Sequence, residues 1–143
     1  MATMTKFNAF VEDLAEGVHN LGANALTIAL FPASAPPDAT KTTLAGIGSQ
    51  TAYTNLASNP TSRILTVSSS AQSSGTYKLV LADLVLTASG GTVGPFRYLV
   101  VYNDTAASDQ LIGWFDYLAD VTLQNGETFT LDFDPTNGVL QLA

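Results

Sequence analysis

The sequence contains no cysteine and a single histidine. Without cysteine, neither a disulfide framework nor a thiolate zinc site is possible. Nucleophilic triads and histidine-rich metal sites need a second histidine or a cysteine, so they are nearly excluded. We interpret His19 as a solvent-exposed residue on the polar face of a helix. These absences predict a protein that is not an enzyme and carries neither cofactor nor metal.

Charge is also scarce, because charged residues make up 12% of the chain, about half the usual share. Five Lys and Arg stand against twelve Asp and Glu, which gives a net charge of -7. An acidic excess argues against DNA or RNA as a partner, since phosphate binding depends on Lys and Arg. We therefore expect no nucleic acid among the partners.

Long apolar runs are missing as well. No stretch approaches the roughly 20 apolar residues that span a bilayer. Glu12, Asp13 and Glu16 interrupt the amino-terminal segment, which is incompatible with the apolar region of a signal peptide. We expect no membrane partner, and a protein that stays in the compartment where it is made. Its 143 residues suffice for one domain that folds without disulfides or a metal.

Residues 5–21 are predicted to form one amphipathic helix. Apolar residues recur there at spacings of three and four, which places them on one face. Thr5 is the expected N-cap and Gly22 the expected stop. We expect residues 1–22 to pack on the following domain or on a partner. The apolar face consists of Phe7, Phe10, Val11, Leu14, Val18 and Leu21.

Beyond Gly22 the pattern changes to the alternation typical of strands. Turn-forming residues recur at short intervals, which favours an antiparallel β-sandwich, with a jelly roll as one form of it, over residues 23–143. Asn125-Gly126 and Asn137-Gly138 suit tight hairpin turns. The expected strands are 25–31, 63–69, 76–88, 96–102, 110–117, 121–123, 127–133 and 139–142.

Residues 33–60 are dominated by Ala, Thr, Ser, Gly and Pro. We expect a long irregular loop there, with one helical turn near residues 42–46. Compact domains seldom contain so long a loop without a reason, and such loops are often binding elements or mobile arms. This composition makes the loop a candidate contact segment.

The acidic residues gather after Arg97, a stretch without Lys or Arg. Asp132 and Asp134 would point the same way on a continuous strand, and with Asp104 or Asp109 they would offer a calcium ion oxygen ligands. No complete calcium signature is present, and acids in turns and at strand ends also discourage aggregation. We therefore favour solvated acids over a metal site or a glycosidase pair.

Trp114 and Phe115 are neighbouring aromatic residues that would point to opposite faces of a strand. An exposed aromatic side chain on a sheet can serve as a platform for a sugar ring. Core packing or a subunit contact is the more frequent role of such residues. Both interpretations remain open from the sequence.

Several segments spread over most of the chain carry a further pattern. They are KFNAFVEDLAEGVH (6–19), LTIAL (26–30), TLAGI (43–47), SAQSSGTYKLVLAD (70–83), GPFRY (94–98) and LIGWFDY (111–117). Together they resemble small virion structural proteins of tailed bacteriophages. They include no catalytic signature, so no active-site residue is carried over.

The resemblance implies a non-enzymatic virion component, assembled in the host cytoplasm. Most similar is a capsid decoration or cement protein bound to the major capsid protein, and such proteins are often trimers. A tail or head-tail component, or a carbohydrate-binding adhesion module, is the alternative. The helix and the long loop are the segments least expected to form part of the β-sandwich. We therefore expect them to contact partners. The candidates are Phe7, Phe10, Val11, Leu14, Val18, Leu44, Ile47 and Tyr53.

Overall fold

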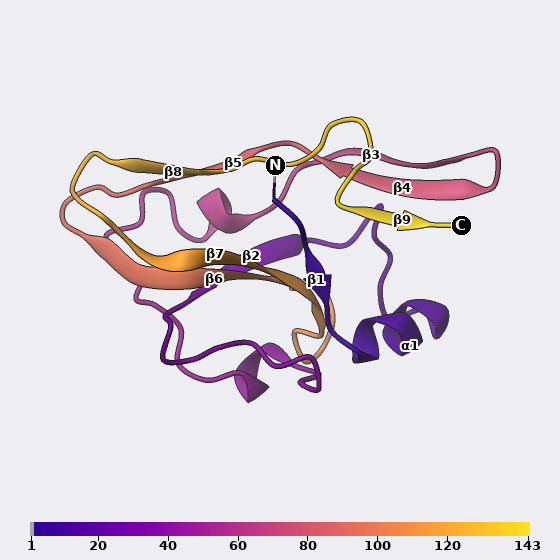
Figure 1. Ribbon diagram of the computed structural model, residues 1–143, viewed down its shortest axis with the longest axis horizontal. Coiled ribbons are helices and arrows are strands. Elements are labelled where there is room, and N and C mark those ends of the chain that lie inside the picture. The colour runs from indigo at the N-terminus through magenta and orange to yellow at the C-terminus, as the bar shows by residue number, and fades with distance from the viewer. Residues whose placement is uncertain (1) are drawn as a thin grey trace.

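The computed structural model describes residues 2–143, and its strands form three antiparallel sheets (Figure 1). The prediction of a mainly β protein with antiparallel strands and one α-helix is confirmed. The elements are β1 (Thr5–Lys6), α1 (Ala9–Ala15), β2 (Leu26–Phe31), the 3-10 helices η1 (Leu44–Gly46) and η2 (Thr61–Arg63), β3 (Val67–Ser73), β4 (Thr76–Leu81), β5 (Leu84–Thr87), β6 (Val93–Asn103), β7 (Leu111–Leu123), β8 (Thr128–Leu131) and β9 (Leu140–Leu142).

The sheets lie in two layers (Figure 1). One layer is a four-stranded sheet in the order β1-β7-β6-β2. The other contains the sheets β3-β4-β9 and β5-β8. Since β5 follows β4 and β9 follows β8, these two sheets are successive parts of one bent antiparallel pair. The pairing breaks at residues 82–83 on one strand and 132–139 on the other.

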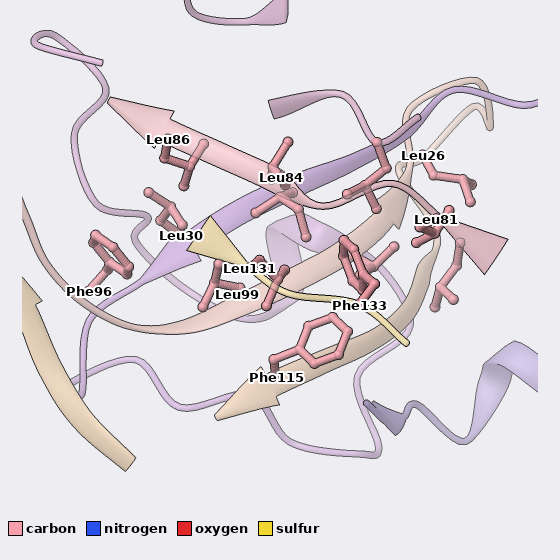
Figure 2. Close-up of a cluster of buried hydrophobic side chains, with 14 of the residues drawn as sticks. Leu26, Leu30, Leu81, Leu84, Leu86, Phe96, Leu99, Phe115, Leu131 and Phe133 are labelled. Atoms are coloured by element: carbon pink, nitrogen blue, oxygen red, sulfur yellow. The ribbon is translucent and has the colours of Figure 1, made fainter. Parts of the chain in front are cut away.

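The main core lies between the two layers. Figure 2 shows side chains of β2, β6 and β7 pointing toward those of β4, β5 and β8. Strand alternation explains the arrangement, because every second residue of a strand faces the same side. Leu131 and Phe133 are buried in this core while Thr130 is exposed, as the alternation of residues 128–133 predicts.

The opposite face of the four-stranded sheet is also covered. Phe31 and Val100 point to that side and are fully buried. Leu44 of η1 and Ile47 pack against them, so residues 33–60 cover their own sheet. Residues 26–31 of the edge strand β2 and residues 98–102 of the central strand β6 are apolar on both faces, and both faces are covered.

The predicted helix over residues 5–21 is wrong in extent. Thr5 pairs with Trp114 as part of β1, so it is not an N-cap. The residue before the helix is Asn8, whose side chain makes no capping hydrogen bond. The helix ends after Ala15 because Gly17 adopts a φ of +80°, the left-handed conformation that terminates helices. Gly22 thus does not act as the stop.

Several strand boundaries differ from the predicted ones. Residues 61–63 form η2, and the following strand runs to Ser73, so only Ser74 and Gly75 make the turn to β4. The predicted strand 76–88 is interrupted at residues 82–83. The predicted strands 110–117 and 121–123 merge into one strand, β7, which begins at Leu111, and Gln110 forms an isolated bridge with Thr43.

The two Asn-Gly turns have different roles. Asn125-Gly126 joins β7 to β8, and Gly126 has the positive φ that such a turn needs. Asn137-Gly138 does not close a hairpin, because β8 pairs with β5 and β9 pairs with β4. No helix in the described residues is long and apolar enough to cross a membrane.

Candidate functional site

The most unusual surface feature is a bulge in β7. Tyr98 of β6 pairs with Asp116, and Phe96 pairs with Val121. Arg97 on β6 thus faces residues 117–120 on β7, and the surplus residues bend out of the sheet. Within this bulge, Leu118 has a φ of +66°. We call residues 117–120 the β7 knob.

The base of the β7 knob is held by an ion pair. The Arg97 guanidinium donates from Nε and Nη2 to the two carboxylate oxygens of Asp116, at 2.8 and 3.0 Å. The same carboxylate accepts a hydrogen bond from the backbone N–H of Leu118 at 2.7 Å. The hydrogen bonds from Arg97 lower the pKa of Asp116. Asp116 thus bonds to Arg97 on β6 and to the backbone of Leu118 on its own strand. These bonds hold the knob in one orientation.

The β7 knob presents apolar side chains to solvent. Leu118 is 76% exposed and Tyr117 is 55% exposed. The ring of Tyr117 packs edge-on against Phe129, which packs in the same way on the buried Phe96. The knob therefore stands on a rigid aromatic base that is continuous with the core.

Holding Leu118 in this position costs free energy. A residue other than glycine in the left-handed region costs on the order of 1 kcal/mol or more. An exposed leucine also forgoes the roughly 2 kcal/mol that its burial contributes. Strained backbone is concentrated at functional sites such as ligand clamps, and tyrosine is enriched among the residues that dominate binding. The strained Leu118 beside the exposed Tyr117 therefore makes the β7 knob the candidate contact site.

The surroundings of the β7 knob are acidic. Asp116 precedes the knob and Asp120 is its last residue, with Arg97 as the neighbouring cation, and the described residues after Arg97 include no Lys or Arg. A hollow of about 380 Å³ opens beside it, lined by Ala2, Thr3, Leu99, Phe115, Asp116, Tyr117, Phe129, Thr130, Leu131 and Asp132. The site thus combines an apolar centre with carboxylates around it.

The predicted contact residues occupy different places. Phe7, Phe10 and Leu44 are buried within their own chain, so they have almost no surface left for a partner. Leu14, Val18, Ile47 and Tyr53 are half-buried. Val11 is 53% exposed. None of these residues belongs to the β7 knob.

Tyr53 serves the attachment of the long loop. Its hydroxyl donates to Gln50 and accepts a hydrogen bond from the backbone N–H of Leu30 at 2.9 Å. The buried Arg63 lies over its ring at 4.1 Å from the centroid and donates to the backbone carbonyl of Ile28 at 2.7 Å. These contacts fasten residues 33–60 to β2, which excludes a freely mobile arm at this point.

The acids considered for calcium are not arranged as predicted. β8 ends at Leu131, so Asp132 and Asp134 are not on one continuous strand. Asp134 accepts hydrogen bonds from the backbone of Thr136 and Asn137 in its own turn. Within residues 2–143, no group of three His, Asp or Glu side chains is placed to hold a metal.

The predicted pair of strand aromatics also lies inward. Phe115 is buried in the main core, and Trp114 packs on Phe7 with 4.6 Å between ring centroids. The exposed aromatic residue of this strand is Tyr117. It packs on Phe129 at the rim of the space between the two layers, and it is not among the residues singled out from the sequence.

The prediction of an exposed His19 is wrong. The side chain is buried, and its Nδ1 lies 3.0 Å from Nδ2 of the fully buried Asn103. Because the Asn103 amide donates, Nδ1 accepts and the imidazole is neutral. Burial lowers the pKa of His19, and the charge of Asp13, 3.9 Å from Nε2, opposes that shift in part.

Comparison with known proteins adds no relative. Neither a family model, nor a curated protein, nor a solved structure matches the chain. The β7 knob and the sequence resemblance therefore carry the functional argument.

Proposed function

We propose that this protein is a non-enzymatic structural component of tailed-bacteriophage virions. In this proposal it is a capsid decoration or cement protein that binds the lattice of the major capsid protein. The observation that carries the proposal is Leu118, a strained and exposed apolar side chain on a rigid base. The resemblance of the sequence to small virion proteins supplies the class of partner.

The chemistry of the β7 knob defines what the partner surface must offer. Leu118 and Tyr117 require an apolar recess, because water is displaced from both side chains on binding. Asp116 is already paired with Arg97, so Asp120 is the carboxylate of the knob that favours a Lys or Arg beside that recess, which would steer the approach. A lattice that presents such recesses between its subunits would be bridged by the bound protein.

The carboxylates support a structural role. Asp116 binds Arg97, Asp134 closes its own turn, and Asp38 accepts hydrogen bonds from Thr40. Each of these groups stabilises local backbone. We further propose that the two layers form a β-sandwich, with the main core between them.

The first prediction concerns Leu118→Gly. Glycine adopts a positive φ without strain, so the free energy of unfolding should rise by about 1 kcal/mol. Binding to heads of the phage that encodes the protein should nevertheless be lost, because the anchor is gone. Co-sedimentation with purified heads measures binding, and chemical denaturation measures stability.

Val85→Ala is the matched control, since Val85 is 51% exposed on β5 and lies outside the β7 knob. It should bind heads like the wild type. Equal binding by Leu118→Gly and wild type would contradict the anchor. A wild-type protein found by electron microscopy on the tail or neck, or one that instead binds glycans on an array, would replace the decoration role with one of its alternatives.

A further inference from the structure

The outer edge of β3 is open. β3 is an edge strand of its sheet, and among residues 2–143 its strand partner is β4. Residues 68–73 are all exposed. The β3–β4 hairpin extends past the rest of the molecule at one end of its long axis (Figure 1). Ser70 lies opposite the buried Leu79, and its side chain meets the segment at Gly22 on the inner face of the sheet. A second strand would therefore approach the edge beside that segment, with the outer face of the hairpin open.

The hairpin geometry identifies the free backbone groups. Ser74 and Gly75 have φ values of +50° and +82°, as in a type I′ turn. Ser73 and Thr76 flank that turn as a hydrogen-bonded pair, and such pairs alternate along an antiparallel ladder. Ser69, Ala71 and Ser73 thus bond to β4. The N–H and C=O groups of Ser70 and Gln72 point to the open edge.

This edge lacks the usual protection. Natural edge strands are blunted by Lys, Pro or inward-pointing charges, which prevent pairing with another chain. Residues 67–75 read VSSSAQSSG and contain no charge and no proline. A single register shift, between Val67 and Ser69, leaves residues 69–73 regular. The edge is therefore a template for strand pairing.

We propose that two copies of this protein join through their β3 strands. The strands run antiparallel about a two-fold axis at Ala71, so that Ser70 of each copy pairs with Gln72 of the other. Each such pair exchanges two backbone hydrogen bonds. The result is a continuous sheet in the order β9-β4-β3-β3-β4-β9.

Charge argues for a second copy as the occupant. The protein has a net charge of -7, so most contacts between two copies bring acids together. The β3 edge brings Ala71 opposite Ala71 and Ser69 opposite Ser73, without any charge. A two-fold contact also uses the same surface on both copies, so no second complementary surface is required. The dimer does not depend on the proposed function, and it stands in place of the trimer that the resemblance implies.

Ala71→Glu tests the axis. Ala71 lies opposite Lys78 on β4, so the new carboxylate gains a cation within its own hairpin and the fold is retained. Across the axis, however, two carboxylates face each other and pairing should be lost. Light scattering after gel filtration should give the mass of two chains for the wild type and of one chain for Ala71→Glu. Circular dichroism should be unchanged.

Charge reversal makes the test specific. Ala71→Lys puts a second cation opposite Lys78, which costs some stability, so its fold is checked by circular dichroism as well. It should be a single chain alone, and a mixture of Ala71→Glu with Ala71→Lys should regain the mass of two. Thr128→Glu adds the same charge to an exposed position of β8 and should remain a dimer. A wild-type mass of one or three chains, a dimeric Ala71→Glu, or a mixture that stays at one chain overturns the proposal.

Discussion

At the scale of single residues, the polar cluster around the buried Asn103 depends on several hydrogen bonds that must all form. Its amide group donates to Oδ1 of Asn24 at 2.9 Å and contacts Nδ1 of His19, while its carbonyl oxygen accepts from the backbone of Thr105 at 3.0 Å. Buried polar groups that lose a partner cost about 1–3 kcal/mol each. The cluster therefore ties the segment after α1 to the end of β6.

This cluster makes stability depend on pH. The folded protein lowers the pKa of His19 from its ordinary 6.5, so the unfolded chain binds the proton first. The contribution of His19 is constant above that value, and the free energy of unfolding falls as the pH drops below it. Asp13 faces the ring and moderates the loss. Denaturation of the wild type from pH 7.5 to 5 should show this fall.

His19→Gln provides the control, because glutamine can accept from Asn103 but does not titrate in this range. The difference in stability between the variant and the wild type should change in the variant's favour as the pH falls from 6.5 to 5. A difference that stays constant across that interval would show that His19 is not held neutral by its surroundings.

At the scale of elements, α1 is part of the domain rather than a detachable arm. Phe10 is 1% exposed and packs with the main core, whereas the next residue, Val11, points to solvent. Seven residues are too few for a helix to be stable alone in water. Its stability therefore comes from docking Phe10 on the sheets.

Two neighbouring substitutions test this assignment. Phe10→Ala should lower the free energy of unfolding by about 3–5 kcal/mol, because it leaves a cavity in the core. Val11→Ala should change it by less than about 0.5 kcal/mol. Urea denaturation followed by circular dichroism measures both. Equal and small effects would mean that α1 is independent of the core.

At the scale of the whole molecule, one sheet serves two apolar clusters. The four-stranded sheet contributes Leu99 and Phe115 to the main core and Val100 and Leu111 to the cluster beneath residues 33–60. Because alternate residues of the same strands belong to different clusters, neither cluster can open without loosening the other. The chain should therefore unfold as one unit.

Trp114 reports on this cooperativity. It is the only tryptophan and packs on Phe7 at the second cluster, while far-ultraviolet circular dichroism reports on the strands. Urea transitions followed by the two signals should coincide, as expected for a two-state domain. A fluorescence transition that precedes the loss of strands would indicate that the loop and its cluster open separately.

The sequence by itself determined the class of fold and the inner face of its strands. Alternation at residues 128–133 and the Asn125-Gly126 turn depend on neighbours along the chain, and the structure confirms both. The scarcity of charge also follows from the sequence alone. The structure adds that the open edge strand β3 contains no charged residue.

The tertiary structure alone decided the extent of the helix, the burial of His19 and the position of the knob. Thr5 extends as a strand because Trp114 is beside it, and His19 is buried because Asn103 offers a partner 84 positions away. Leu118 lies outside the predicted strands 110–117 and 121–123, and the structure places it in a bulge because β7 contains surplus residues opposite Arg97. Each outcome depends on contacts between distant segments, and local periodicity contains no information about which distant segments meet.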